Sequence, residues 1–203
     1  MRKNRSPENK CPVCGFIPRL CICSEIEKVD SKIRIILIQH SLDARKPSNT
    51  GNLLKGITDC ELIRYGKLED KPINMEEIEK LNAFVLYPFQ DSILLTKDLW
   101  KEGETPTIII PDGTWKQASR LASRLRGHCR GFLRFPENFV TNYKLRDSRE
   151  EFKLCTCESA RNVYGILGDT KSEQAIDKIF KLFVNRNLKN RGKIISKIDL
   201  SDY

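Results

Sequence analysis

Apolar residues follow two different spacings along this chain, one typical of strands and one typical of helices. Short runs rich in β-branched and aromatic residues predict strands at residues 33–39, 61–65, 83–87, 107–110 and 132–135. Apolar residues three and four positions apart predict helices at residues 53–56, 75–82, 92–100, 115–126, 157–167 and 172–185. A late strand is predicted at residues 193–200.

Strands that alternate with helices predict the α/β class, with a mainly parallel sheet that carries helices on both faces. Polar residues and turn formers predict loops at 41–51 and 136–151. One boundary is predicted near residue 30. It separates residues 1–29, a polar tail with a small cysteine-rich segment, from residues 30–203, one sheet domain with a basic C-terminal tail.

Composition narrows the class of protein. The chain has 203 residues, of which 39% are hydrophobic and 31% are charged, so it can bury a core and stay in solution. The first ten residues lack the apolar stretch of a secretory signal. No apolar run approaches the roughly 20 residues of a membrane span. We therefore expect a cytoplasmic protein.

The formal net charge of +9 is concentrated in two places. The segment from Trp115 to Arg134 contains no acidic residue, and its basic residues are Lys116, Arg120, Arg124, Arg126, Arg130 and Arg134. Further basic residues follow in the tail after residue 180. Clustered positive charge indicates a polyanion, most often a nucleic acid. A solvated helix face is the alternative, although such faces usually mix both signs.

Lys116, Arg120 and Arg124 recur every four residues and therefore share one face of the predicted helix. A phosphodiester backbone bound along that face would be led toward the residue where the preceding strand ends.

Four cysteines lie close together near the N-terminus, at Cys11, Cys14, Cys21 and Cys23. Their Cys-x2-Cys and Cys-x-Cys spacing favours a closed tetrahedral zinc site, which would fold a segment too short to form its own core. Unligated or redox-active cysteines are the alternative. Two disulfides would need an oxidising compartment, which nothing else in the sequence supports.

The end of the strand at 107–110 is the strongest candidate for a functional site. Pro111, Asp112, Gly113, Thr114 and Trp115 follow the apolar run, and a helix begins at once. Ligands of open α/β sheets bind at the carboxyl ends of strands. Asp112 or Thr114 could simply cap the helix. A cap does not explain the indole or the basic helix that follows.

Two further segments offer polar groups at predicted strand ends or helix starts. His40, Asn49 and Thr50 flank a turn-rich loop, where they could meet a ligand or only satisfy loop backbone. Thr156 and Glu158 fit the first turn of a helix, as a cap and an acidic residue near its positive end. The residues alone favour this ordinary first turn.

These motifs, in this order, resemble the DTW-domain family of tRNA-uridine aminocarboxypropyltransferases. The resemblance rests on the four cysteines, His40, the Asn49-Thr50-Gly51 loop, the Asp112-x-Thr114-Trp115 motif, Tyr143-x-Leu145-Arg146, Thr156 and Glu158. It covers residues 11–168. The chain departs from the family pattern at Asp43, where Glu is usual, at Cys155, where Ser is common, and at Ser159, where Ala is common.

The resemblance implies a SPOUT-like α/β fold with a knotted C-terminal region. It also implies that the protein transfers the 3-amino-3-carboxypropyl group of S-adenosylmethionine to N3 of a uridine in tRNA and releases methylthioadenosine. The short N-terminal segment favours a uridine of the variable loop over one of the D-arm. The rival functions are a SPOUT-type RNA methyltransferase and a non-catalytic, zinc-containing RNA-binding protein.

Site residues follow from the resemblance and from the chemistry of the side chains. Asp112 is the candidate base for the uridine N3–H, with Thr114 beside it, and Trp115 could stack on the uracil or adenine ring or pack as a core indole. Arg146 could hold the carboxylate of the donor, and Leu133, Cys155, Thr156 and Glu158 would shape the cofactor pocket. RNA contacts are expected at His40, Asn49, Thr50, Lys116, Arg120 and Arg124.

Overall fold

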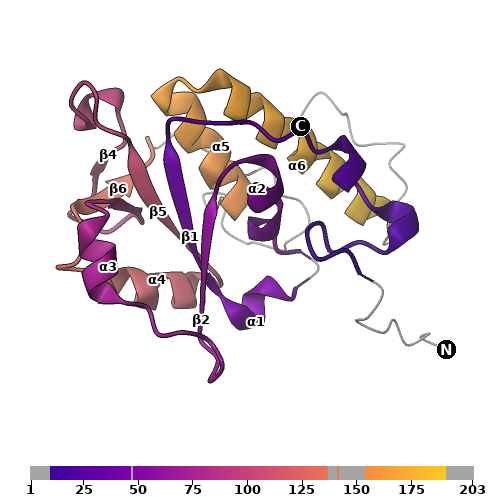
Figure 1. Cartoon of the computed structure of the whole chain (residues 1–203), viewed down its shortest axis with the longest axis horizontal. Coiled ribbons are helices and arrows are strands. Elements are labelled where there is room, and N and C mark those ends of the chain that lie inside the picture. Colours follow the sequence, from indigo (N-terminus) through magenta and orange to yellow (C-terminus); the bar gives the residue numbers. More distant parts are fainter. Residues whose placement is uncertain (1–9, 47, 137–140, 142–153, 191–203) are drawn as a thin grey trace.

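The computed structural model describes residues 10–46, 48–136, 141 and 154–190. In this part of the chain six parallel strands form one sheet in the order β2-β1-β5-β3-β6-β4 (Figure 1). The strands are β1 (Arg34–His40), β2 (Glu61–Tyr65), β3 (Phe84–Leu86), β4 (Ile93–Leu94), β5 (Thr107–Asp112) and β6 (Gly131–Arg134). The predicted α/β class with a parallel sheet is confirmed.

Six α-helices connect or follow these strands in the described residues. They are α1 (Ser41–Ala44), α2 (Gly51–Ile57), α3 (Met75–Lys80), α4 (Trp115–Arg124), α5 (Thr156–Leu167) and α6 (Thr170–Asn190). Three short 3-10 helices lie at Pro18–Leu20, Cys23–Glu25 and Lys97–Leu99. None of the helices described is both long and apolar enough to span a membrane.

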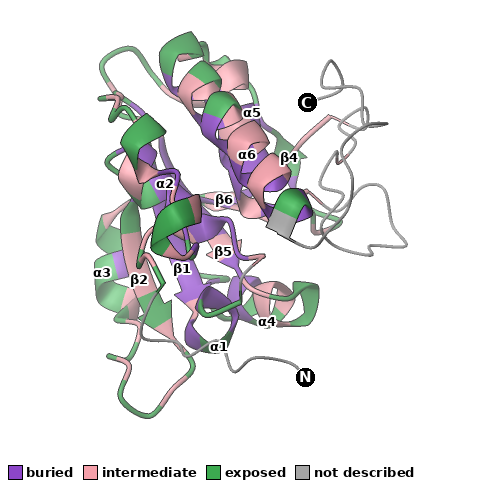
Figure 2. Cartoon of the chain, turned by 90° about the vertical axis from the view of Figure 1, so that its right-hand side faces the viewer, coloured by how far each residue is buried: buried purple, intermediate pink, exposed green. Residues whose placement is uncertain are grey.

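Helices cover both faces of the sheet because successive strand side chains point to opposite sides. Ile35 and Leu37 of β1 pack in the same cluster as α2, α5 and α6. Ile36 and Ile38 face the other way and pack with α3 and α4. The central strands are therefore buried on both sides, and their carboxyl ends meet at one edge of the sheet (Figures 1 and 2).

The cysteine-rich segment packs on the same core as the sheet. Phe16 lies against Phe183 of α6, with ring centroids 5.4 Å apart, and Ile22 is fully buried. The amide of Val29 donates to the carbonyl of Ile57 at the end of α2. The predicted boundary near residue 30 thus falls where the segment is already anchored to α2.

The structure corrects two of the predicted elements. Residues 92–100 do not form a helix: they contain the short edge strand β4 and a single turn at Lys97–Leu99. The predicted loop at 41–51 begins with the one-turn helix α1, which His40 caps by accepting from the amide of Leu42. The predicted strand at 193–200 lies outside the described residues, as do residues 137–140, 142–153 and 191–203. The strand and the C-terminal knot therefore stay predictions.

Candidate functional site

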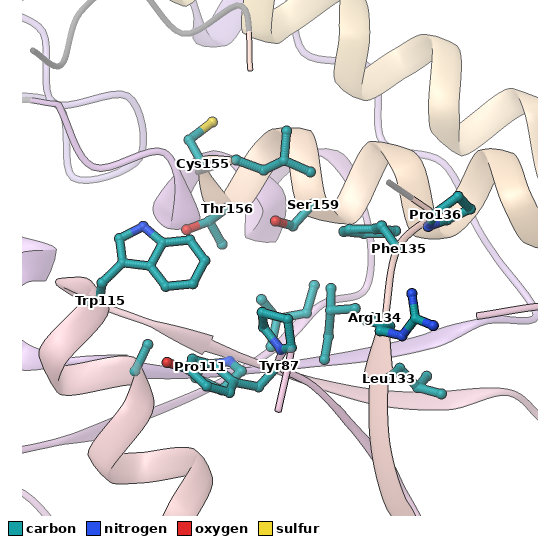
Figure 3. Close-up of a pocket in the computed structure, with 16 residues that line it drawn as sticks. Tyr87, Pro111, Trp115, Leu133, Arg134, Phe135, Pro136, Cys155, Thr156 and Ser159 are labelled. Atoms are coloured by element: carbon teal, nitrogen blue, oxygen red, sulfur yellow. The ribbon is translucent and has the colours of Figure 1, made fainter. Parts of the chain in front are cut away.

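A cavity of about 730 Å³ opens at the carboxyl edge of the sheet, where the first turn of α5 faces the ends of β3, β5 and β6 (Figure 3). Its walls are mainly apolar, and hydroxyl groups from α5 project among them. The predicted residues on its walls are Trp115, Leu133, Cys155 and Thr156. Ligands of parallel sheets bind at this edge, so the cavity is the candidate site.

Asp112 lies behind this cavity rather than on its wall. The side chain ends β5, is 2% exposed and accepts hydrogen bonds on both carboxylate oxygens. Gln39 and Asn49 donate amide hydrogens to its Oδ2, at 2.7 and 3.1 Å. The hydroxyl of Thr156 donates to its Oδ1, at 2.6 Å. Three donors thus hold the Asp112 carboxylate in place, and Thr156 is the partner that also reaches the cavity.

The Asp112 network joins three distant parts of the chain. Gln39 belongs to β1 and pairs in register with Asp112, Asn49 precedes α2, and Thr156 begins α5. Thr50 adds a further tie, since its hydroxyl accepts from the amide of Cys157, at 3.2 Å. This buried polar network fixes the first turn of α5 over the strand ends, although Oε1 of Gln39 accepts no hydrogen bond from the described residues.

Gly51 provides a direct test of how tightly this network is packed. A Cβ at Gly51 would lie 2.4 Å from Oδ2 of Asp112 and 2.9 Å from Nε2 of Gln39. Both neighbours are buried, so Gly51→Ala should lower the free energy of unfolding by about 2–3 kcal/mol, as overpacking does. Gly56→Ala, in the same helix, meets only side-chain methyl groups, the nearest at 3.2 Å, and is the control. Equal urea midpoints for the two variants would contradict this prediction.

Glu158 supports the first turn of α5 and does not line the cavity. It is 2% exposed and accepts from the amide of Cys155 at 2.7 Å and from the hydroxyl of Thr141 at 2.9 Å. The interpretation as an ordinary first turn therefore holds for Glu158. The predicted cap at Thr156 is wrong: Cys155 is the N-cap of α5, and the Thr156 hydroxyl donates to Asp112 instead. Burial also raises the pKa of Cys155 and of Cys157, so both thiols stay protonated near neutral pH and neither suits a nucleophile.

Trp115 stands at the other side of the cavity as the first residue of α4. Thr114 caps this helix: its hydroxyl accepts from the amide of Gln117, whose side chain accepts from the amide of Thr114 in return. The indole is 38% exposed, and its ring centroid lies 6.1 Å from that of Tyr87. The alternative of a core indole is wrong, because the ring forms a cavity wall.

Five of the six basic residues from Lys116 to Arg134 fall into two groups. Lys116, Arg120 and Arg124 are exposed on the outer face of α4 and form no ion pair with the residues that the structure describes. Arg126 instead pairs with Asp91, at 2.5 Å, and Arg130 pairs with Glu104. The charge available to a polyanion therefore lies along α4, starting one residue after Trp115.

The remaining predicted residues lie away from the cavity wall. His40 caps α1 and its ring packs edge-on against Tyr65, with centroids 5.0 Å apart. Asn49 and Thr50 are 5% and 1% exposed, which places them inside the polar network and not on the outer surface. Arg146 lies outside the described residues. The contact of Arg146 with the donor carboxylate and the RNA contacts of His40, Asn49 and Thr50 stay predictions.

Two residues that matter to the site were not identified from the sequence. Gln39 ends the predicted strand at 33–39, and a polar side chain directly after the apolar run Ile35–Ile38 is a signal for a buried partner. Tyr87 ends the predicted strand at 83–87, and an aromatic residue at the carboxyl end of a strand could have indicated the cavity.

The four cysteines form a second candidate site, in the segment that packs against α2 and α6. Their sulfur atoms all lie within 4.8 Å of one another, with Cys11 to Cys23 at 3.4 Å and Cys14 to Cys21 at 3.6 Å. Tetrahedral zinc with Zn–S bonds of about 2.3 Å places its sulfur ligands about 3.8 Å apart. The cluster therefore has the donor set and spacing to hold a metal such as zinc.

Local interactions favour the thiolate form of one of these cysteines, Cys11. Burial opposes the ionisation of Cys11. Hydrogen bonds from the backbone of Cys14 and Val13 and from the thiols of Cys23 and Cys14 together outweigh it and lower the pKa of Cys11 to about 7. Burial raises the pKa of Cys14 and of Cys23. A thiolate is the form that binds a metal, so Cys11 is suited to be the first ligand.

Comparison with known proteins agrees with the motifs. The family model of the DTW domain matches residues 8–188, so the chain belongs to the DTW-domain family, that of the tRNA-uridine aminocarboxypropyltransferases. The match extends beyond the predicted range of 11–168 and includes most of α6. No solved structure matched the chain. Membership implies a protein that modifies tRNA.

Proposed function

We propose that this member of the DTW-domain family transfers the 3-amino-3-carboxypropyl group of S-adenosylmethionine to N3 of a uridine in tRNA. One observation carries the proposal: the Asp112-x-Thr114-Trp115 turn of the matched family ends at a cavity. The open side of this cavity adjoins a basic helix face that forms no ion pair with the described residues. A polyanionic substrate and a small donor could therefore meet at one point.

The cavity suits the proposed donor in size and chemistry. About 730 Å³ lies within the range of small-molecule sites, and apolar walls with a few hydroxyl groups suit a nucleoside. Leu133 and Cys155 would contact its rings, while Thr156 and Ser159 project hydroxyls between the walls. We propose that Arg146 holds the carboxylate of the donor. Glu158 would act by fixing the turn that carries Thr156.

The reaction needs the proton on uridine N3 to leave before N3 can attack. The donor supplies an electrophilic carbon beside its sulfonium; N3 bonds to that carbon, the carbon–sulfur bond breaks, and methylthioadenosine leaves with the electron pair. Asp112 is the proposed base. Since Thr156 lies between Asp112 and the cavity, we propose that Asp112 acts through this hydroxyl, which would take the N3 proton while passing its own to Oδ1.

We propose a structural zinc ion at the four cysteines. Four thiolate ligands leave no open position, so the ion would fold its segment and take no part in transfer. The cluster lies on the α2 and α6 side of the core, whereas the cavity lies at the strand ends. Elemental analysis of the purified protein is expected to find about one zinc per chain.

Product analysis tests the proposed reaction against its rivals. The purified protein would be incubated with S-adenosylmethionine and unmodified tRNA, and the tRNA digested to nucleosides for mass spectrometry. Aminocarboxypropyl-uridine together with methylthioadenosine is the expected result, and fragments of the tRNA would place it in the variable loop or the D-arm. A methylated nucleoside with S-adenosylhomocysteine would support the methyltransferase instead. Binding of tRNA without binding of the donor would leave the non-catalytic function.

The outer face of α4 should control how strongly tRNA binding depends on salt. Replacing Lys116, Arg120 and Arg124 by Gln should reduce the slope of log K against log salt by about 2, since each lost phosphate contact contributes about 0.7–0.9. Replacing three exposed lysines outside α4, Lys55, Lys80 and Lys101, removes the same charge and is the control. Equal slopes for the two triple variants would show that α4 does not contact the tRNA.

A further inference from the structure

The two ends of the cavity differ in exposure and in what surrounds them. Figure 3 shows Trp115 at one end and Leu133 to Pro136 at the other, with Thr156 and Ser159 between them. Leu133 is fully buried, whereas the indole of Trp115 is 38% exposed. Arg134, Phe135 and Pro136 are half-buried. The end at Leu133 is therefore the deeper one, with a buried apolar floor, and the end at Trp115 is more open to the surface.

Positive charge adjoins the open end. Lys116 directly follows Trp115, and Arg120 and Arg124 continue the same outer face of α4 away from it. At the deep end, Arg134 uses its Nε to donate to the carbonyl of Ser92, at 3.2 Å. A phosphodiester chain is held by Lys and Arg side chains that reach the solvent, so its path runs past the open end.

The difference in size between tRNA and the small donor then decides which of them binds at which end of the cavity. A tRNA strand cannot enter a cavity of about 730 Å³; it can only insert one base while its phosphates remain outside. That base must enter where the positive surface meets the cavity, at Trp115. The small donor has no such restriction and can occupy the deep end.

We propose that Trp115, supported by Tyr87, forms the subsite for the acceptor base, and that the donor binds at the Leu133–Pro136 end. This inference rests on the proposed function and extends it by assigning the two subsites. The capping of α4 by Thr114 and Gln117 fixes the backbone that aims the indole, and the ring of Tyr87 packs against it at 6.1 Å. A pyrimidine base stacks on the exposed face of such an indole.

Fluorescence of Trp115 gives a readout that does not depend on turnover. The chain has two tryptophans. The other, Trp100, packs edge-on against Phe84 of β3, with ring centroids 5.5 Å apart. In a Trp100→Phe variant, an unmodified tRNA transcript should quench the remaining emission strongly, and S-adenosylmethionine alone should change it little. Stronger quenching by the donor than by tRNA would reverse the assignment and overturn the proposal.

Steady-state kinetics of matched variants give the second readout. Trp115→Ala should raise KM for tRNA about 10- to 100-fold, as expected for loss of one stacked base, and should leave Kd for S-adenosylmethionine within about twofold. Trp115→Phe should keep most of the affinity. Phe135→Ala, at the deep end, should do the opposite and weaken donor binding. An unchanged KM for tRNA in Trp115→Ala would refute the subsite.

The two proposals fail in different ways. Quenching of Trp115 by tRNA in a protein that neither binds S-adenosylmethionine nor forms a product would reject the proposed reaction and keep the base subsite. Donor binding and product formation, with no tRNA-dependent quenching and no effect of Trp115→Ala, would keep the reaction and reject the subsite.

Discussion

Replacing Asp112 by Asn should reduce turnover by about 100-fold or more while the protein still binds S-adenosylmethionine and tRNA. The carboxylate accepts on both oxygens, from Gln39 and Asn49 on one side and from Thr156 on the other. An asparagine amide has one acceptor, so its NH₂ must face donors on one of these sides. Either orientation disturbs the Thr156 hydroxyl or the network that fixes it. Single-turnover rates and donor titrations of the variant check this prediction.

A double-mutant cycle separates action through Thr156 from direct contact of Asp112 with the substrate. If Asp112 acts through the hydroxyl, Thr156→Val should lower turnover about as much as Asp112→Asn, and the double variant should be no worse than either. Thr156→Ser keeps the hydroxyl and should retain most activity. Asp91→Asn removes an exposed carboxylate that pairs with Arg126 and is the control. Losses that multiply in the double variant, or a nearly normal rate for Asp112→Asn, would rule out the coupled pair.

Much of the sheet could be predicted, because the residues of its central strands indicate strands without any information from distant contacts. Ile35 to Ile38 and Ile108 to Ile110 are continuous β-branched or apolar runs, and the structure buries them on both faces. Parallel strands covered on both sides require this composition. The edge of the sheet that holds the cavity could also be predicted, since loops converge at the carboxyl end of a buried strand.

The short elements could not be predicted, because distant contacts decide them. Ile93 and Leu94 of β4 are exposed edge residues, and their pairing with Leu133 and Arg134 makes them a strand. The local sequence pattern around them indicates neither a helix nor a strand strongly. Helix α1 depends in the same way on a cap from His40, the last residue of β1.

The polar network was also hidden in the sequence for a physical reason. Gln39, Asn49, Asp112 and Thr156 are separated by up to 117 positions in the chain, and only the sheet register and the packing of α5 bring them together. Each has an ordinary local explanation, as a strand end, a turn or a cap. Likewise the charge run after Trp115 suggested one surface, whereas ion pairs with Asp91 and Glu104 remove Arg126 and Arg130 from it.

Removing one cysteine of the metal cluster should destabilise the whole protein and not only its N-terminal segment. Cys14 and Ile22 are 3% and 0% exposed, and Phe16 packs on Phe183 of α6. A segment of this length has no core of its own, so its fold would depend on the metal. Losing the segment would uncover the α2 and α6 side of the core. We expect Cys11→Ser to lower the free energy of unfolding by about 3 kcal/mol.

Three measurements on Cys11→Ser test this dependence together. Zinc content should fall well below that of the wild type, the melting temperature should fall by about 6–12 °C, and residual transfer activity should remain at low temperature, because the cavity lies away from the cluster. Cys129→Ser changes a half-buried cysteine outside the cluster and should alter neither zinc content nor melting temperature appreciably. Purified wild-type protein without zinc would reject the metal site. Loss of turnover in the folded Cys11→Ser protein would instead give the cluster a part in the reaction, since a purely structural metal acts only through the fold.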